Sequence, residues 1–94
     1  MDMVFDSNDQ PVHPMNFGRT LKNFDTIRQW QFVQNDQYKY TIKLEVTDES
    51  QLEKVVSELK GILGEKADIG VELVNEIPLL TSGKRKPVVC EWKH

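Results

Sequence analysis

The chain has 94 residues, 38% of them hydrophobic and 29% charged, with a formal net charge of -3. A chain of this length buries only about two-thirds of the surface that it exposes when unfolded, so we expect one globular domain over residues 1–94. The charge balance excludes a general attraction to nucleic acid or to an anionic membrane. One cysteine and two histidines exclude an internal disulfide and a zinc site of the usual spacing.

The sequence carries no signal for membrane insertion or secretion. No apolar run approaches the roughly 20 residues that span a bilayer. Residues 1–6 have neither the basic region nor the apolar stretch of a secretory signal. We therefore expect cytoplasmic residence and no membrane contact.

The first part of the chain predicts a short hairpin followed by a helix. Residues 6–9 are Asp-Ser-Asn-Asp, whose side chains favour a turn because they hydrogen-bond to nearby backbone groups. Pro14 suits the first turn of a helix, where its missing N–H would have had no partner. Apolar residues recur at helical spacing from Phe17 onward, so a helix is expected near Met15 to Lys22.

The next two segments predict a pair of strands. Ile27 to Gln34 is apolar, aromatic and glutamine-rich, and residues 35–37 are polar turn formers. Apolar and polar residues then alternate from Tyr38 to Val46, which is typical of a strand with one face on a core and one in water. We expect the two segments to form an antiparallel hairpin.

A second helix is expected from Glu49 to Leu63, with sequence signals at its start and at its end. Ser50 followed three residues later by Glu53 predicts a capping box at its start, and Gly64 predicts its end. Its apolar residues fall on one helical stripe: Leu52, Val55, Val56, Leu59, Ile62 and Leu63.

Two further strands complete the predicted fold. Alternating apolar residues predict them at Ile69 to Leu73 and at Val88 to Trp92. The order helix, strand, strand, helix, strand, strand indicates an α+β two-layer sandwich. We expect a mainly antiparallel sheet of about four strands with two helices on one face, plus the short N-terminal hairpin. Periodicity does not determine the strand order.

Side chains that could carry catalysis are scarce. Cys90 lies on the apolar face of a predicted strand, so we interpret it as a small buried hydrophobe rather than a reactive thiol. His13, between Val12 and Pro14, has no nucleophile or carboxylate at a recognisable spacing and is expected at the helix entry or on the surface. The terminal His94 is expected to be solvated.

Residues 81–86, Thr-Ser-Gly-Lys-Arg-Lys, are the one segment that suits a binding site. Small hydroxyl groups, a glycine and a lysine at a loop tip can hold an anion. The upstream glycine of a P-loop is missing and Arg85 replaces its hydroxyl residue, which excludes that motif. By itself, such a segment is more often a solvated turn than a site.

Residues 76–86, Glu-Ile-Pro-Leu-Leu-Thr-Ser-Gly-Lys-Arg-Lys, resemble the last motif of AMP-forming ligases. The branch that they most resemble is that of phenylacetate-coenzyme A ligases and CapK-like capsular polysaccharide biosynthesis proteins. Residues 28–34, Arg-Gln-Trp-Gln-Phe-Val-Gln, are similar to a glutamine-rich stretch before a tyrosine-rich strand in that branch. Residues 11–14 are similar to the segment that opens the first helix of its C-terminal subdomain, and residues 2–5 resemble its interdomain hinge.

The resemblance implies a mobile lid, the C-terminal subdomain of an adenylate-forming ligase. It implies that Lys84 is the catalytic lysine and that Ser82 and Gly83 shape its loop. It further implies that Asp2 is a hinge residue. His13 stands where the phenylacetate enzymes usually have phenylalanine, which leaves the acceptor of the acyl group open.

The same resemblance implies the partners and cofactors of the complete enzyme. A large N-terminal adenylation domain, in cis or in trans, would supply the nucleotide and acid pockets, and the isolated chain would be inactive. ATP and Mg2+ would be the cofactors, coenzyme A a candidate acceptor, and no metal ligand is expected in this chain.

Two other functions are alternatives to the lid. A free-standing α+β module that binds a ligand or a protein could have the lid fold without catalysis, because fold does not determine function. A ligase body encoded directly upstream would favour the lid instead. An RNA-binding domain of similar topology is disfavoured, because the aromatic residues of the predicted strands come with no strand rich in Lys and Arg.

Overall fold

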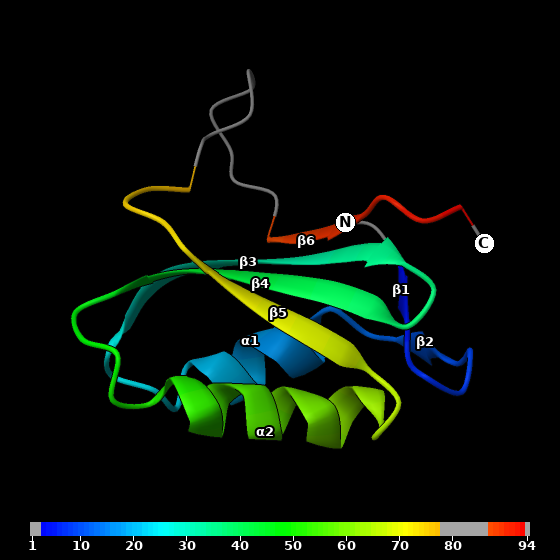
Figure 1. Cartoon of the computed structure of the whole chain (residues 1–94), viewed down its shortest axis with the longest axis horizontal. Coiled ribbons are helices and arrows are strands. Elements are labelled where there is room, and N and C mark those ends of the chain that lie inside the picture. Colours follow the sequence, from blue (N-terminus) through cyan, green and yellow to red (C-terminus); the bar gives the residue numbers. More distant parts are fainter. Residues whose placement is uncertain (1–2, 78–86, 94) are drawn as a thin grey trace.

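The structure is a computed structural model that describes residues 3–77 and 87–93. Both helices lie on one face of the larger sheet, which confirms the predicted α+β two-layer arrangement (Figure 1). The strands form a two-stranded sheet, β1-β2, and a four-stranded sheet in the order β5-β4-β3-β6. The elements in chain order are β1 (Val4–Phe5), β2 (Pro11–Val12), α1 (Met15–Leu21), β3 (Ile27–Asp36), β4 (Lys39–Val46), α2 (Leu52–Leu63), β5 (Asp68–Leu73) and β6 (Val88–Cys90).

The larger sheet is mixed, so the expectation of a mainly antiparallel sheet is corrected. β3 and β4 are antiparallel, as predicted. β5 runs parallel to β4, and β6 runs parallel to β3. The reason for the first parallel pair is the connection: α2 carries the chain back along the sheet between β4 and β5, and parallel neighbours need such a crossover. Neither helix in the described part of the chain is long and apolar enough to cross a membrane.

The β3–β4 hairpin closes later than predicted, with Gln37 and Tyr38 as its two turn residues. Tyr38 has a φ of 63°, in the left-handed region that side chains other than glycine rarely adopt. Its hydroxyl donates to the Asp9 carboxylate at 3.0 Å, and the Gln37 amide donates to the same carboxylate at 3.1 Å. This hydrogen bond to Asp9 raises the pKa of Tyr38. The turn of the N-terminal hairpin is therefore joined to the turn of the main hairpin.

The core lies between the helices and the sheet. Phe17 of α1 and Phe32 of β3 are fully buried, and their rings stack with centroids 4.2 Å apart. Leu59 of α2 and Ile42 of β4 are also fully buried. Leu59 lies on the apolar stripe predicted for α2, and Ile42 lies on the apolar face predicted for β4.

The two ends of α2 differ in how well the sequence predicted them. The Ser50 hydroxyl and N–H both donate to the Asp48 carboxylate, which lowers the pKa of Asp48. The helix starts after Gln51 without a side-chain cap, so the predicted capping box is wrong. Its end is confirmed: Gly64 follows the last residue, and its N–H donates to the Lys60 carbonyl at 2.8 Å.

The β1–β2 hairpin is fastened to the rest of the fold. The Phe5 N–H donates to the side-chain carbonyl of Gln34, a fully buried residue of β3, at 2.9 Å. The Phe5 carbonyl accepts from the Tyr40 hydroxyl at 2.6 Å. Ser7 donates its N–H to the Leu63 carbonyl at the end of α2 at 2.7 Å. The hairpin is thus tied to two strands and a helix.

Candidate functional site

The candidate site residues that the resemblance implies lie outside the described part of the chain. This holds for Ser82, Gly83 and Lys84 in the predicted catalytic loop and for the hinge candidate Asp2. The described residues on either side of positions 78–86 define where the chain leaves and rejoins the sheet, and with it the base of the candidate site.

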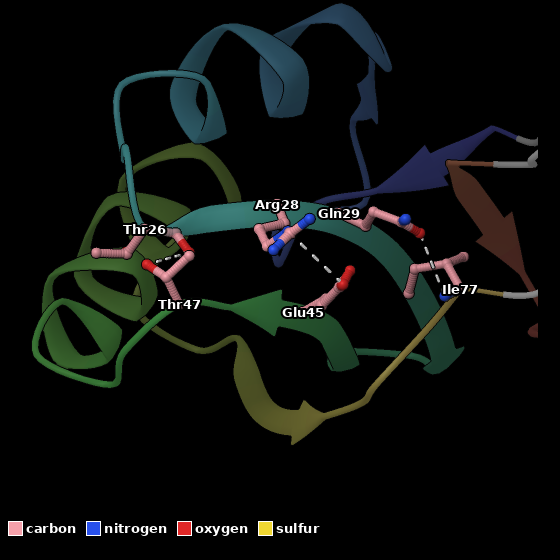
Figure 2. A network of polar contacts seen from close by, with 6 residues as sticks. All are labelled: Thr26, Arg28, Gln29, Glu45, Thr47 and Ile77. Carbon is pink, nitrogen blue, oxygen red and sulfur yellow. Dashed lines mark hydrogen bonds and ion pairs between the residues drawn. The ribbon is translucent and has the colours of Figure 1, made fainter.

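The chain enters this segment from Ile77, which is 1% exposed. Its N–H donates to the side-chain carbonyl of Gln29 on β3 at 3.3 Å (Figure 2). Trp30 and Phe32 of the same strand pack toward the core, so the alternation of a strand places Gln29 on the opposite face. Ile77 is therefore held on the face of the sheet away from the helices.

The chain returns at Pro87, again on β3. The Pro87 carbonyl accepts from the Phe32 N–H at 2.8 Å, and the following residue, Val88, is fully buried in β6. Gln29 and Phe32 are three residues apart on the strand, which corresponds to roughly 10 Å. Both ends of the segment 78–86 are therefore held by one strand inside the sheet.

A cationic side chain lies beside this base. Register between β3 and β4 shifts between Ile27 and Gln29, which makes Arg28 the extra residue of a β-bulge. The Arg28 Nε lies 4.0 Å from a carboxylate oxygen of Glu45, and the arginine side chain remains 68% exposed (Figure 2). Such a pair contributes little to folding and leaves the arginine accessible.

Sequence reasoning did not identify Arg28 as a site residue. Simple alternation places Arg28 on the same face as Trp30, which packs against the core. The bulge redirects it, and nothing in the local sequence predicts a bulge there. Arg28, Gln29 and Trp30 line a hollow of about 330 Å³ together with Pro87, next to the described ends of the segment 78–86.

His13 has the structural surroundings that the sequence predicts, and Cys90 differs in part from the prediction. The His13 Nδ1 accepts the N–H of Met15 at 3.1 Å, which confirms its role at the entry of α1. Cys90 is half buried rather than buried, because its strand is the outer one of the sheet. Its thiol lies 3.2 Å from the Trp92 carbonyl oxygen. His94 lies outside the described residues.

Within residues 3–77 and 87–93, no group of three or more His, Cys, Asp and Glu side chains is placed to hold a metal ion. The described polar groups at the base of the candidate site are the Gln29 side-chain amide and the Arg28 guanidinium group.

Comparison with known proteins identifies the family. The model of the CapK C-terminal domain matches residues 4–91. No curated protein matches the chain at a significant level. The matched range contains every helix and strand described above and also the segment with Ser82, Gly83 and Lys84. The chain therefore belongs to the CapK C-terminal domain family.

Proposed function

We propose that this chain is the mobile lid of an adenylate-forming ligase, which activates a carboxylic acid with ATP as the acyl adenylate. The observation that carries the proposal is the family match over residues 4–91, because it includes the Ser82-Gly83-Lys84 segment. A family described as a C-terminal domain implies an accompanying N-terminal domain. In the proposed enzyme, that domain holds the nucleotide and the acid, and coenzyme A is a candidate acceptor.

The fastening of the N-terminal hairpin supports a lid that moves as one body. Gln34 and Tyr40 hold Phe5 through its N–H and its carbonyl, so β1 moves with the sheet. A hinge then has to lie before Val4. Asp2, the hinge candidate, stands two residues before Val4 in the sequence. Hinges of this kind take up a domain rotation in a few residues between rigid parts.

The base of the loop supports the role of Lys84. A catalytic group must be held close to its productive position, which requires a firm support for the loop that carries it. Gln29 holds the entry of the segment at Ile77, and the Phe32 N–H holds its exit at Pro87. The exposed Arg28 adds a positive charge at the same base.

The chemistry assigned to this chain is electrostatic. The Lys84 ammonium group would contact the substrate carboxylate and the phosphate oxygens and offset the charge that develops as the adenylate forms. ATP and Mg2+ would be bound mainly by the N-terminal domain. After adenylate formation, rotation of the lid about its hinge would present another face to the intermediate for transfer to the acceptor.

The test is Lys84→Ala in the complete ligase. Adenylation should slow roughly 10² to 10³-fold, the effect of removing one preorganised electrostatic group. Transfer from supplied adenylate should change much less, because the lid has then rotated. Pyrophosphate release and thioester formation measure the two steps separately.

Lys86→Ala is the matched control and should leave both rates unchanged. If Lys84→Ala leaves adenylation as fast as in the parent enzyme, the lid mechanism is wrong. That result would favour the free-standing binding module.

A further inference from the structure

β5 forms an open edge of the four-stranded sheet. It is the outermost strand, next to β4. All of its residues are exposed except Ile69, which is half buried against the core. Val71 is 37% exposed and Leu73 is 44% exposed, so this edge carries two large apolar side chains in water. Isolated exposed apolar residues are ordinary, but two on the outermost strand of a sheet form an apolar row.

The backbone of this edge is ready to pair. The Asp68 N–H donates to the Tyr38 carbonyl at 2.8 Å, and the Val74 N–H donates to the Leu44 carbonyl at 2.9 Å. Even-numbered residues of β5 therefore direct their backbone groups toward the neighbouring strand. By alternation, Ile69, Val71 and Leu73 direct theirs outward.

Three devices that often protect an edge strand, namely lysine, proline and a β-bulge, are missing from β5. The segment Asp68–Leu73 contains no lysine and no proline, and its pairing with β4 is regular throughout. Edge strands without lysine, proline or a bulge are templates for pairing with another chain.

We propose that β5 pairs antiparallel with β5 of a second copy of this chain, about a two-fold axis through Val71. In this register Val71 lies opposite Val71 of the second copy, and Ile69 lies opposite Leu73 of the second copy. Residues with outward backbone groups then face one another, which allows about six hydrogen bonds between the two strands. Their side chains lie on one face and form a continuous apolar row across the interface.

The acidic residues of β5 favour this register over the two neighbouring ones. Asp68 and Glu72 lie on the opposite face from Val71, because side chains alternate along a strand. With the axis at Val71, Glu72 lies opposite Gly70 of the second copy, and no carboxylate faces another. With the axis at Gly70, Asp68 would face Glu72, and with the axis at Glu72, two copies of Glu72 would meet. Like charges directly opposite each other destabilise a strand pair.

This argument favours a second copy over an unrelated strand. An unrelated strand would have to place apolar side chains beside Ile69, Val71 and Leu73. It would also have to keep acidic side chains away from Asp68 and Glu72. β5 meets both conditions against itself in the register that pairs Ile69 to Leu73 along their whole length. The proposal is independent of the lid function, since it uses only the edge of the sheet and not the loop or the hinge.

The first experiment is sedimentation of the 94-residue chain over a range of concentration. A reversible equilibrium between monomer and dimer is expected between about 10 μM and 1 mM, as for small interfaces. Val71→Lys should weaken the dimer at least about tenfold, because two lysines would meet at the axis. Met15→Lys is the matched control: Met15 is an apolar side chain of α1, 54% exposed, and its replacement should leave the equilibrium unchanged.

The second experiment tests the register at Gly70, where a side chain can be added without strain. A Cβ there would meet only the Tyr40 carbonyl oxygen, at 3.9 Å. Gly70→Lys should strengthen the dimer and Gly70→Glu should weaken it, each roughly 2- to 30-fold, because the new charge faces Glu72 of the second copy. Circular dichroism checks that both variants are folded.

Three results would overturn the proposal. If the parent chain stays monomeric at the highest concentration, β5 does not pair with a second copy. A strand of another protein would then be the alternative partner of this edge. Weakening by both Gly70 variants places the axis at Gly70. If the parent and Val71→Lys dimerise with the same dissociation constant, β5 is not part of the dimer interface.

Discussion

Gly64 ends α2 in a conformation that other residues do not adopt. Its φ is 99° and its ψ is 163°, a combination found essentially only in glycine. A Cβ at this position would also overlap with the Ser7 hydroxyl. Ser7 is held there by its N–H, which donates to the Leu63 carbonyl. One glycine thus allows the N-terminal hairpin to pack against the end of the helix.

Gly64→Ala should therefore lower the free energy of unfolding by about 1–3 kcal/mol. Gly61→Ala is the control, because Gly61 lies inside α2 with open space around it, and there alanine should stabilise the fold by about 0.4–1 kcal/mol. Urea unfolding followed by circular dichroism measures both. The double variant Ser7→Ala/Gly64→Ala should recover only that part of the lost unfolding free energy that is due to the overlap with the Ser7 hydroxyl. Equal effects of the Gly64 and Gly61 changes would contradict the strain at Gly64.

Tyr40 is the residue whose titration reports on the fold. It is 2% exposed, and burial raises its pKa from 10.0 to about 12. Its hydroxyl donates to the Phe5 carbonyl at 2.6 Å, and only the protonated form can donate. Because its pKa is higher in the folded chain than in the unfolded chain, its contribution to stability is complete below pH 10 and is lost as the pH rises toward 12.

Tyr40→Phe should lower the free energy of unfolding by about 1–2 kcal/mol near pH 8, because the hydrogen bond from the buried Tyr40 hydroxyl to the partly buried Phe5 carbonyl is lost. The difference between the parent and this variant should narrow from pH 10 to pH 12, since only the parent loses a stabilising hydroxyl proton there. Urea titrations at several pH values measure the difference. A difference that stays constant across this interval would show that Tyr40 does not titrate as proposed.

At the scale of elements, β3 organises the molecule. It pairs with β4 and β6, holds β1 through Gln34, and anchors both ends of the segment 78–86 through Gln29 and Phe32. Its glutamines serve as local partners for backbone groups that no strand ladder reaches. Two glutamines of β3 thus have a structural role, since Gln34 accepts the Phe5 N–H and Gln29 accepts the Ile77 N–H.

Gln29→Leu should release the entry of the loop without unfolding the sheet. The Ile77 N–H loses its partner, at a cost of about 1–3 kcal/mol in local opening. Amide hydrogen exchange at Ile77 should accelerate by roughly 10- to 100-fold. Gln37→Leu is the control, because Gln37 lies at the other end of the hairpin and contacts Asp9 instead. Unchanged exchange at Ile77 in the Gln29 variant would show that this hydrogen bond does not hold the loop.

At the scale of the whole molecule, the described part presents a compact two-layer body. Its hairpin, sheet and helices are joined by hydrogen bonds that cross between elements. The rotation that the proposed function requires would therefore have to occur outside residues 4–77. A lid of this kind adds its loop and charge to a site that is built elsewhere. In the proposed function, this chain thus supplies Lys84, and the N-terminal domain supplies the nucleotide and acid pockets.

The isolated chain should accordingly form no acyl adenylate. Adenylation needs two bound substrates and a metal ion in a site that excludes water, and a single loop does not supply it. Purified chain with ATP, Mg2+ and a panel of carboxylic acids should release no pyrophosphate above the blank. Adding the N-terminal domain in trans provides the positive control. Acid-dependent pyrophosphate release by the 94-residue chain alone would refute the proposed division of labour.

The sequence by itself determined the helices, most of the strands and the central hairpin. These follow from interactions within a few residues: the alternation from Tyr38 to Val46, the apolar stripe of α2, and the turn between β3 and β4. The motif with Lys84 is also visible in the sequence. So is the resemblance to CapK-like proteins, and the match to the CapK C-terminal domain confirms it.

Only the tertiary structure decided how these elements are arranged. The parallel partners of β4 and β3, the bulge that redirects Arg28, the burial of Gln34 and the open edge of β5 each depend on residues far apart in the chain. A local pattern cannot predict them, because the same alternation fits a parallel or an antiparallel neighbour and either edge or centre of a sheet. Packing of both helices on one face selects among these arrangements, and that packing is a property of the whole molecule.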